Sequence, residues 1–145
     1  MKKVGSKHVV TEQFFKDNIS GRSNPDIARD LLPELSEEEK KQWIIDKEAY
    51  FCDLARKEIK PVDGLLHLIQ WIKANDIKCA AVTNAPRTNA EMLLEGLNLT
   101  DAFDLLVIAN EIENGKRNKP HPDPYLNAMK GLDVKPEECV VIEGK

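Results

Sequence analysis

The chain has 145 residues, the size of one ordinary domain. Apolar residues make up 41% and charged residues 32%, a balance that allows a buried core and argues against wholesale disorder. The net charge of −4 leaves no basic excess to neutralise a phosphate backbone, so we expect no nucleic-acid partner.

No targeting or membrane segment is expected. The apolar runs at residues 105–109 and 139–142 are far shorter than the ~18–20 residues of a membrane span. The basic residues 1–8 are not followed by the apolar core of a secretory signal. Three cysteines, an odd number without metal-ligand spacing, suit a reducing compartment. The sequence therefore predicts a cytoplasmic protein with no membrane association.

The first part of the chain, residues 1–60, is charge-rich and is predicted to form helices without a strand. Thr11 has the side chain to cap a first short helix. Asn24 followed by Pro25 resembles an N-cap with proline at the first helical position, and it predicts a second helix that Pro33 stops.

A third, long helix is predicted to run toward Ile59. Ser36 and Glu39 have the spacing of a capping box, in which each side chain accepts a hydrogen bond from the backbone N–H of the other residue. The apolar residues of this helix are expected to form one broad buried face. They are Trp43, Ile44, Ile45, Ala49, Phe51, Cys52 and Ala55.

Helical and strand patterns alternate in the second part of the chain. Apolar strands are predicted over residues 77–83, 105–109 and 139–142. Leucine and isoleucine at helical spacing predict a helix over residues 65–72. Such alternation favours a parallel sheet, so the expected fold class is α/β with a partial Rossmann-like sheet.

Two further helix starts are predicted within the α/β part. Thr88 and Glu91 have the spacing of a second capping box. Pro122 and Pro124 are expected to open the last helix, since proline is tolerated in a first helical turn.

Polar side chains stand where ligands bind in parallel sheets, beyond the carboxyl ends of the strands. Thr83 and Asn84 end the first predicted strand and precede a predicted helix start, an arrangement that favours an anion such as phosphate. Taken alone, this pair is better read as the end of a strand and the start of a turn.

Two charged residues are further candidates. Lys119 precedes Pro120 on a proline-stiffened loop, where a held cation can neutralise a phosphoryl group. Glu143 follows the last predicted strand, where a carboxylate can hold Mg²⁺ beside a phosphate or can simply face solvent. Arg22 lies in a loop between helices and is read either as an anion contact or as a solvated loop residue.

In their order and spacing, residues 80–87 (AAVTNAPR), 119–126 (KPHPDPYL) and 140–143 (VVIE) resemble motifs two, three and four of the haloacid dehalogenase-like hydrolase superfamily. Residues 11–59 look like the helical cap of its small sugar-phosphate phosphatases. The resemblance implies a helical cap region over residues 1–60 and an incomplete α/β core over residues 61–145.

The resemblance also implies a chemistry, phosphoryl transfer through a covalent aspartyl-phosphate. Thr83 would hydrogen-bond the phosphoryl group and Lys119 would balance its charge, both as catalytic groups. Glu143 would help to place Mg²⁺, the implied cofactor. Three further residues would lie on the side of the small phosphorylated substrate: Asn84, Arg87 and Arg22.

One motif of the family is missing. The family's first motif, Asp-x-Asp, supplies the nucleophile and a general acid/base, and the sequence contains no Asp-x-Asp. Gly144 also stands where the family usually has an Asp after the glutamate. We therefore expect a parent activity of Mg²⁺-dependent phosphate monoester hydrolysis, in a truncated form with little or no turnover of its own.

The missing motif would also remove a central strand, so the expected strand order is 105–109, 77–83, a gap, and 139–142. An unpaired buried backbone group destabilises a fold by ~1–3 kcal/mol. Three outcomes are therefore considered: the last strand pairs with residues 77–83 and closes the gap, it stays loose, or another chain fills the gap. The alternative function is accordingly a non-catalytic binding or regulatory protein with a partner at the open sheet edge. A helical bundle is a third possibility.

Overall fold

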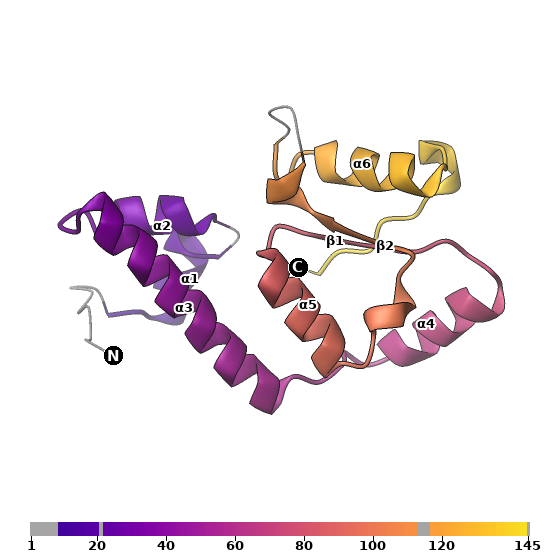
Figure 1. Cartoon of the computed structure of the whole chain (residues 1–145), viewed down its shortest axis with the longest axis horizontal. Helices are drawn as coiled ribbons and strands as arrows, with labels where there is room; N and C mark the ends of the chain where they lie inside the picture. The colour runs from indigo at the N-terminus through magenta and orange to yellow at the C-terminus, as the bar shows by residue number, and fades with distance from the viewer. Residues whose placement is uncertain (1–8, 21, 113–116, 145) are drawn as a thin grey trace. The chain divides into compact units, whose positions relative to one another are not determined.

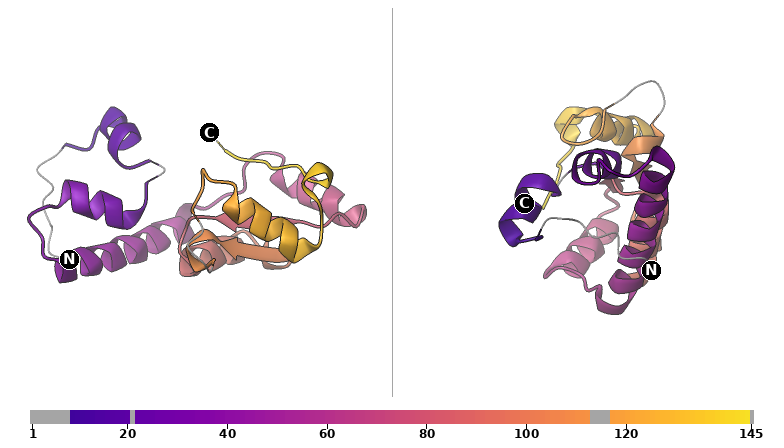
Figure 2. Two further views of the ribbon diagram at one scale, coloured as in Figure 1. Left: turned by 90° about the horizontal axis from the view of Figure 1, so that it is seen from above. Right: turned by 90° about the vertical axis from the view of Figure 1, so that its left-hand side faces the viewer.

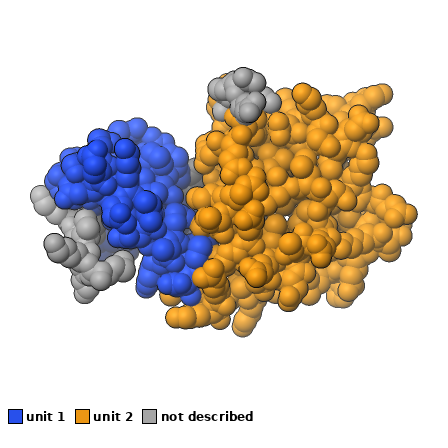
Figure 3. Space-filling model, viewed as in Figure 1, with its two compact units in different colours: residues 1–53 blue, residues 54–145 orange. Residues whose placement is uncertain are grey.

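The computed structural model describes residues 9–20, 22–112 and 117–144. The expectation of no secretory signal at residues 1–8 lies outside the described residues. The chain divides into two compact units, residues 1–53 and residues 54–145, which Figure 3 colours separately. The assignment of residues 1–60 as a cap and residues 61–145 as a core stays a prediction.

The first unit is built from helices α1 (Glu12–Asn18) and α2 (Asn24–Leu31) and most of α3 (Glu37–Glu58), labelled in Figure 1. The predicted Thr11 cap is confirmed, because its Oγ1 accepts a hydrogen bond of 3.1 Å from the N–H of Phe14. The predicted N-cap at Asn24 is wrong by one residue. Ser23 caps α2 instead, accepting from the N–H of Asp26, because Pro25 fits the first turn in either register.

Helix α3 begins where the sequence predicts. The N–H of Ser36 donates to Glu39 Oε2 at 2.9 Å, and the N–H of Glu39 donates to Ser36 Oγ at 3.3 Å, so the capping box is confirmed. One side-chain bond joins α3 to α2, from Asn24 Nδ2 to Glu48 Oε1 at 2.7 Å.

The broad buried face predicted for α3 is wrong. No residue of α3 is buried, and the side chains of Ile45 and Phe51 are 60% and 42% exposed. The reason is length, because 22 residues of helix span roughly 33 Å whereas α1 and α2, with 7 and 8 residues, span only about 10–12 Å each. No described helix joins the length and the apolar character that crossing a membrane requires.

The second unit contains a parallel sheet, as predicted, which excludes a helical bundle. Strands β1 (Ala80–Thr83) and β2 (Leu105–Ile108) pair in parallel over all four residues. Cys79 and Asp104 extend the pairing, because the N–H of Cys79 donates to Asp104 Oδ2 at 2.7 Å and the N–H of Asp104 donates to the carbonyl of Cys79 at 2.8 Å.

Helices cover both faces of this sheet. Helix α6 (Asp123–Leu132) lies on one face, and α4 (Leu65–Ala74) and α5 (Arg87–Gly96) lie on the other (Figures 1 and 2). Gly131 permits the close approach of α6, because a Cβ at this position would lie 2.6 Å from Leu105 Cδ2. The buried core of the unit consists of Ile69, Ala90, Met92, Leu99, Ala102, Val107, Ile108, Ala109, Pro124 and Ala128.

The second predicted capping box does not form. Helix α5 begins at Arg87, after Pro86 as its N-cap, and has no side-chain cap bond. Thr88 is therefore already inside the helix, and Glu91 instead accepts a hydrogen bond from Arg87 Nη1 at 3.2 Å. The proline decides the start of this helix, because its restricted backbone suits the position just before the first turn.

The third predicted strand is wrong. Residues 139–142 form no strand, and Val140, Val141 and Ile142 are 88%, 51% and 73% exposed. A strand exists only when its backbone pairs with another strand, and this segment has no such partner within the described part of the chain. Of the three outcomes considered for the last strand, the segment stays unpaired.

Cys79, next to the sheet, provides a pH-dependent test of the fold. Burial, and then the Asp104 carboxylate, raise the pKa of the Cys79 thiol above its usual value. Because the thiolate is the reactive form, we expect iodoacetamide to modify Cys79 more slowly than an unfolded peptide cysteine near pH 8. As the pH is raised further, the modification rate of Cys79 should continue to rise at pH values where the rate of the peptide cysteine has levelled off. The measurement uses the C52S/C139S variant and mass spectrometry.

The control for this experiment is the same variant in denaturing urea, where Cys79 should react like the peptide cysteine. Equal rates for the folded variant and the peptide near pH 8 would contradict the burial of this thiol.

Candidate functional site

The candidate site lies at the carboxyl end of β1. Three segments meet there: the residues after β1, the loop before α6 and the end of the described chain. The backbone and side chain of Lys119 join them, through contacts to Asn84, Val82 and Glu143. All three segments belong to the second unit.

Lys119 is held by fixed oxygen acceptors. Its Nζ donates to the carbonyl of Val82 at 3.1 Å and to Glu143 Oε1 at 2.9 Å. Its side chain is only 21% exposed, and its Nζ lies 6.0 Å from the ring centroid of Tyr125. The ammonium group is therefore drawn to the end of β1, at the point where ligands of parallel sheets bind.

Glu143 is the acceptor of a second bond, from Tyr125 Oη at 2.6 Å. The hydrogen bonds from Tyr125 and then from Lys119 lower the pKa of Glu143 below its usual value, because they favour the ionised form. Burial, and then the bond to Glu143, raise the pKa of Tyr125 to about 12. Near neutral pH the site thus presents a carboxylate that accepts from a neutral phenol and an ammonium group.

Thr83 lies beside this cluster but does not join it. Its Oγ1 accepts a hydrogen bond of 3.0 Å from the N–H of Ala85 at the turn after β1. This bond uses an acceptor lone pair and leaves the hydroxyl proton available as a donor. The two chain neighbours of Thr83, Val82 and Asn84, both contact Lys119.

Asn84 contacts the backbone of Lys119 twice. Its Nδ2 donates to the carbonyl of Lys119 at 3.0 Å, and its Oδ1 accepts from the N–H of Lys119 at 3.0 Å. The carboxamide and the lysine backbone thus form a reciprocal pair between segments 35 residues apart in the chain.

The two arginines predicted on the substrate side have carboxylate partners. Arg87 donates to Glu111 Oε2 from Nε at 3.0 Å and from Nη2 at 2.5 Å, and its hydrogen bonds to Glu111 and then to Glu91 raise the pKa of the guanidinium. Arg22 lies in the first unit, where it pairs with Asp30 and donates to the carbonyl of Asn18 at 3.1 Å. Among the described residues of the second unit, the partners of Arg87 are Glu111 and Glu91, and Lys119 is not among them.

Sequence reasoning assigned no role to three residues that contact the site. Tyr125 lies within residues 119–126, the same motif as Lys119. Its spacing from Lys119 in that motif was the signal that could have identified it as a site residue. Asn110 follows β2 and donates to the carbonyl of Asn84 at 3.4 Å, while Asn118 Nδ2 donates to Asn110 Oδ1 at 2.5 Å. For Asn110 the signal was its place just after β2, because a carboxamide there can cross-link neighbouring loops, whereas Asn118 lies in the loop before α6.

The described residues do not form a complete Mg²⁺ site. Mg²⁺ demands near-octahedral oxygen coordination, and it is usually bound through one or two carboxylates together with phosphate and water oxygens. Glu143 is one such carboxylate, but two hydrogen bonds already occupy its Oε1. Across residues 9–20, 22–112 and 117–144, no three side chains of the His, Cys, Asp or Glu type gather as a metal site would require.

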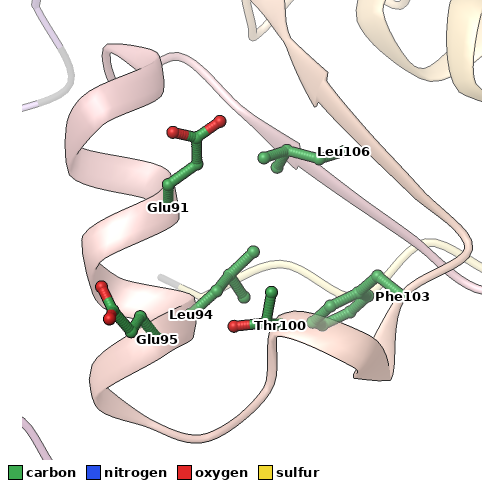
Figure 4. A pocket seen from close by; sticks show the side chains of 6 residues that line it. All are labelled: Glu91, Leu94, Glu95, Thr100, Phe103 and Leu106. Atoms are coloured by element: carbon green, nitrogen blue, oxygen red, sulfur yellow. The ribbon is translucent and has the colours of Figure 1, made fainter.

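A separate pocket of about 440 Å³ lies between α5 and β2 (Figure 4). Leu94, Phe103 and Leu106 form its apolar surface, and the Glu91 and Glu95 side chains project from α5 beside it. None of its lining residues belongs to the candidate site at the end of β1.

Comparison with known proteins identifies the class that this fold and site define. Residues 4–144 match the family model of the haloacid dehalogenase-like hydrolases. The chain belongs to this family, and the predicted α/β core with a helical cap is thereby confirmed as its fold class.

The chain is similar to several sugar-phosphate enzymes. It is 33% identical over 104 residues to a phosphorylated carbohydrates phosphatase of Thermotoga maritima, covering 72% of this chain and 45% of that protein. The crystal structure of β-phosphoglucomutase from Clostridium difficile matches 92% of this chain and 61% of its own, with 30% identity and a TM-score of 0.72.

A family IA hydrolase structure from Entamoeba histolytica matches 86% of this chain and 56% of its own, with 27% identity and a TM-score of 0.70. The chain spans about half the length of the curated relatives that it matches.

Proposed function

We propose that this chain is part of a phosphatase that acts on small phosphorylated sugars or similar phosphate monoesters. The observation that carries the proposal is the placement of the Lys119 ammonium, held between the carbonyl of Val82 and the Glu143 carboxylate at the end of β1. A cation fixed there can neutralise the charge of a phosphoryl group without reorganisation. The 33% identity to a phosphatase of phosphorylated carbohydrates supports the substrate class.

In this proposal Thr83 donates its hydroxyl proton to a phosphoryl oxygen and Lys119 balances the phosphoryl charge. Glu143 is one ligand of a Mg²⁺ ion, and because one carboxylate does not complete such a site we propose no step through the metal. The sequence analysis placed three residues on the substrate side: Asn84, Arg87 and Arg22. For the arginines, this role requires them to leave the carboxylates that they bind.

We further propose that the 145-residue chain is inactive by itself. The sequence contains no Asp-x-Asp, the pair that would supply the nucleophile and the general acid/base. Lys119 and Thr83 can hold a phosphoryl group, but neither replaces an attacking carboxylate. Among the described residues, Cys52, Cys79 and Cys139 form no disulfide, which suits the cytoplasmic location expected for this chain.

The test combines binding and turnover. We expect ³¹P NMR titration to show binding of inorganic phosphate, and we expect no hydrolysis of p-nitrophenyl phosphate with or without Mg²⁺. Absence of phosphate binding would overturn the proposed site. Turnover that disappears in the Lys119→Ala variant would overturn the proposed inactivity and would reveal another nucleophile.

One observation favours the alternative of a non-catalytic binding protein. Among the described residues, β2 is the one strand that pairs with β1, and the apolar residues Val140 and Ile142 are exposed. An open strand edge beside apolar side chains can accept a strand from a partner chain. Size-exclusion chromatography with light scattering tests this alternative, because a partner at the open sheet edge requires a stoichiometric second chain.

A further inference from the structure

We propose that Asn84 is a positioning residue, which holds the Lys119 backbone so that the lysine ammonium stays at the end of β1. The inference rests on the proposed function only in taking Lys119 as the phosphoryl-binding cation. It assigns to Asn84 a role that acts through Lys119 and needs no contact with the substrate.

Asn84 forms two hydrogen bonds with the backbone of Lys119. Its carboxamide binds both backbone groups of one residue, the N–H and the carbonyl of Lys119, each at 3.0 Å. Two bonds to one residue fix the orientation of that backbone as well as its distance, which a single bond does not. Asn84 is half-buried, so water competes less for these bonds than it would on an open surface.

A lysine side chain has many rotamers unless both of its ends are held. The ammonium group of Lys119 stands at the end of a flexible four-carbon stem with large rotamer entropy. Its position is therefore fixed only if the backbone of Lys119 is fixed as well. The Val82 carbonyl and Glu143 hold the Nζ end, and Asn84 holds the backbone end. The residue is therefore held at both ends by the segments that surround the candidate site.

Asn84 is itself held in place by neighbouring asparagines. Asn110, which follows β2, donates to the carbonyl of Asn84 at 3.4 Å, and Asn118 donates to Asn110 at 2.5 Å. Asn84, Asn110 and Asn118 thus link the ends of both strands to the loop that carries Lys119. A carboxamide committed to this linkage has one Nδ2 hydrogen left, which is the only donor that a direct substrate contact would use.

Hydrogen exchange tests the backbone contact directly. In the full chain, Asn84→Ala removes the acceptor of the Lys119 N–H, so we expect exchange of that amide to become roughly 5- to 10-fold faster, measured by NMR. The Val107 amide in the buried strand β2 serves as the internal reference and should not change. Faster exchange at both amides would indicate general destabilisation and would overturn a specific positioning role.

Two variants sharpen this measurement. Asn84→Asp keeps an acceptor for the Lys119 N–H but replaces the donated bond by a carboxylate oxygen opposite the Lys119 carbonyl, so its Lys119 exchange rate should lie between wild type and Asn84→Ala. This variant carries the test if the alanine variant does not fold. Asn75→Ala is the matched control, because Asn75 also donates to a backbone carbonyl, that of Trp71, at the end of α4. It should leave Lys119 exchange at the wild-type rate.

A double-mutant cycle separates positioning from substrate contact. Phosphate affinity is measured by ³¹P NMR for Asn84→Ala in the wild-type and in the Lys119→Met background. We expect Asn84→Ala to weaken binding roughly 5- to 10-fold when Lys119 is present, and less than about 2-fold when it is absent. The same factor in both backgrounds would mean that Asn84 contacts phosphate itself, and would overturn the inference.

The two measurements also separate this inference from the proposed function. If the wild-type chain binds no phosphate, the proposed function fails, and the exchange of the Lys119 amide still decides whether Asn84 holds that backbone. If phosphate binds and Asn84→Ala leaves the Lys119 exchange rate unchanged, the proposed function stands and the positioning role of Asn84 is wrong.

Discussion

Replacing Lys119 with methionine is expected to weaken the binding of inorganic phosphate to the chain by roughly 10- to 100-fold. A hydrogen bond to a charged group contributes ~1.5–3 kcal/mol, and methionine keeps most of the apolar stem of lysine while removing the ammonium. The effect should be large because the Lys119 Nζ is already held at the end of β1, only 21% of the side chain being exposed. Isothermal titration calorimetry or ³¹P NMR measures it.

Lys130→Met is the matched control for this variant. Lys130 is exposed and stands in the last turn of α6, at the opposite end of that helix from Lys119, so its loss changes the net charge equally. The phosphate affinity of the Lys130→Met variant should stay within about 2-fold of wild type, since exposed charges far from a bound ion are screened by salt. Equal losses in the two variants would show that phosphate responds to net charge and has no site at Lys119.

Replacing Ile108 with alanine is expected to lower the free energy of unfolding of the second unit by about 2–5 kcal/mol. Ile108 ends β2 and is 3% exposed, so the change removes buried methyl groups and leaves a cavity between the sheet and its helices. Chemical denaturation followed by tryptophan fluorescence measures the loss. A Trp43→Phe background leaves Trp71 of α4 as the reporter for this unit.

Ile142→Ala provides the control of the same residue type in the same unit. Its side chain is 73% exposed in the unpaired segment, so we expect a change within about 0.5 kcal/mol. A loss comparable to that of Ile108→Ala would show that residues 139–142 are buried in solution, and the description of this segment as unpaired would then be wrong.

The helix caps and the strands of the sheet were predictable because residues close together in the chain determine them. The cap of α1 at Thr11 and the capping box of Ser36 and Glu39 involve hydrogen bonds across three residues, so the sequence displays both partners. The apolar runs that become β1 and β2 were visible for the same reason, and their alternation with helices indicated parallel pairing.

The wrong predictions concern features that depend on distant partners. Residues 139–142 have the composition of a strand, but a strand requires a paired backbone, and none of the described segments provides one. The apolar residues of α3 have helical spacing, but α1 and α2 are too short to cover them. Thr88 has the spacing of a cap, and Pro86 places the helix start before it.

The candidate site divides in the same way. Thr83, Lys119 and Glu143 were identifiable from their order and spacing in three motifs, which is information carried along the chain. The partners of these residues were not, because the contacts of Lys119 with Asn84 and Glu143 join residues 35 and 24 positions apart.

The sequence by itself thus determined the family, the α/β class and the residue types available for binding a phosphoryl group. Only the tertiary structure decided that Asn84 holds the backbone of Lys119, that Tyr125 and Lys119 share Glu143, and that residues 139–142 stay unpaired. The physical reason is that a side chain's chemistry is a local property, whereas its hydrogen-bond partner and its burial depend on which distant segments the folded chain brings beside it.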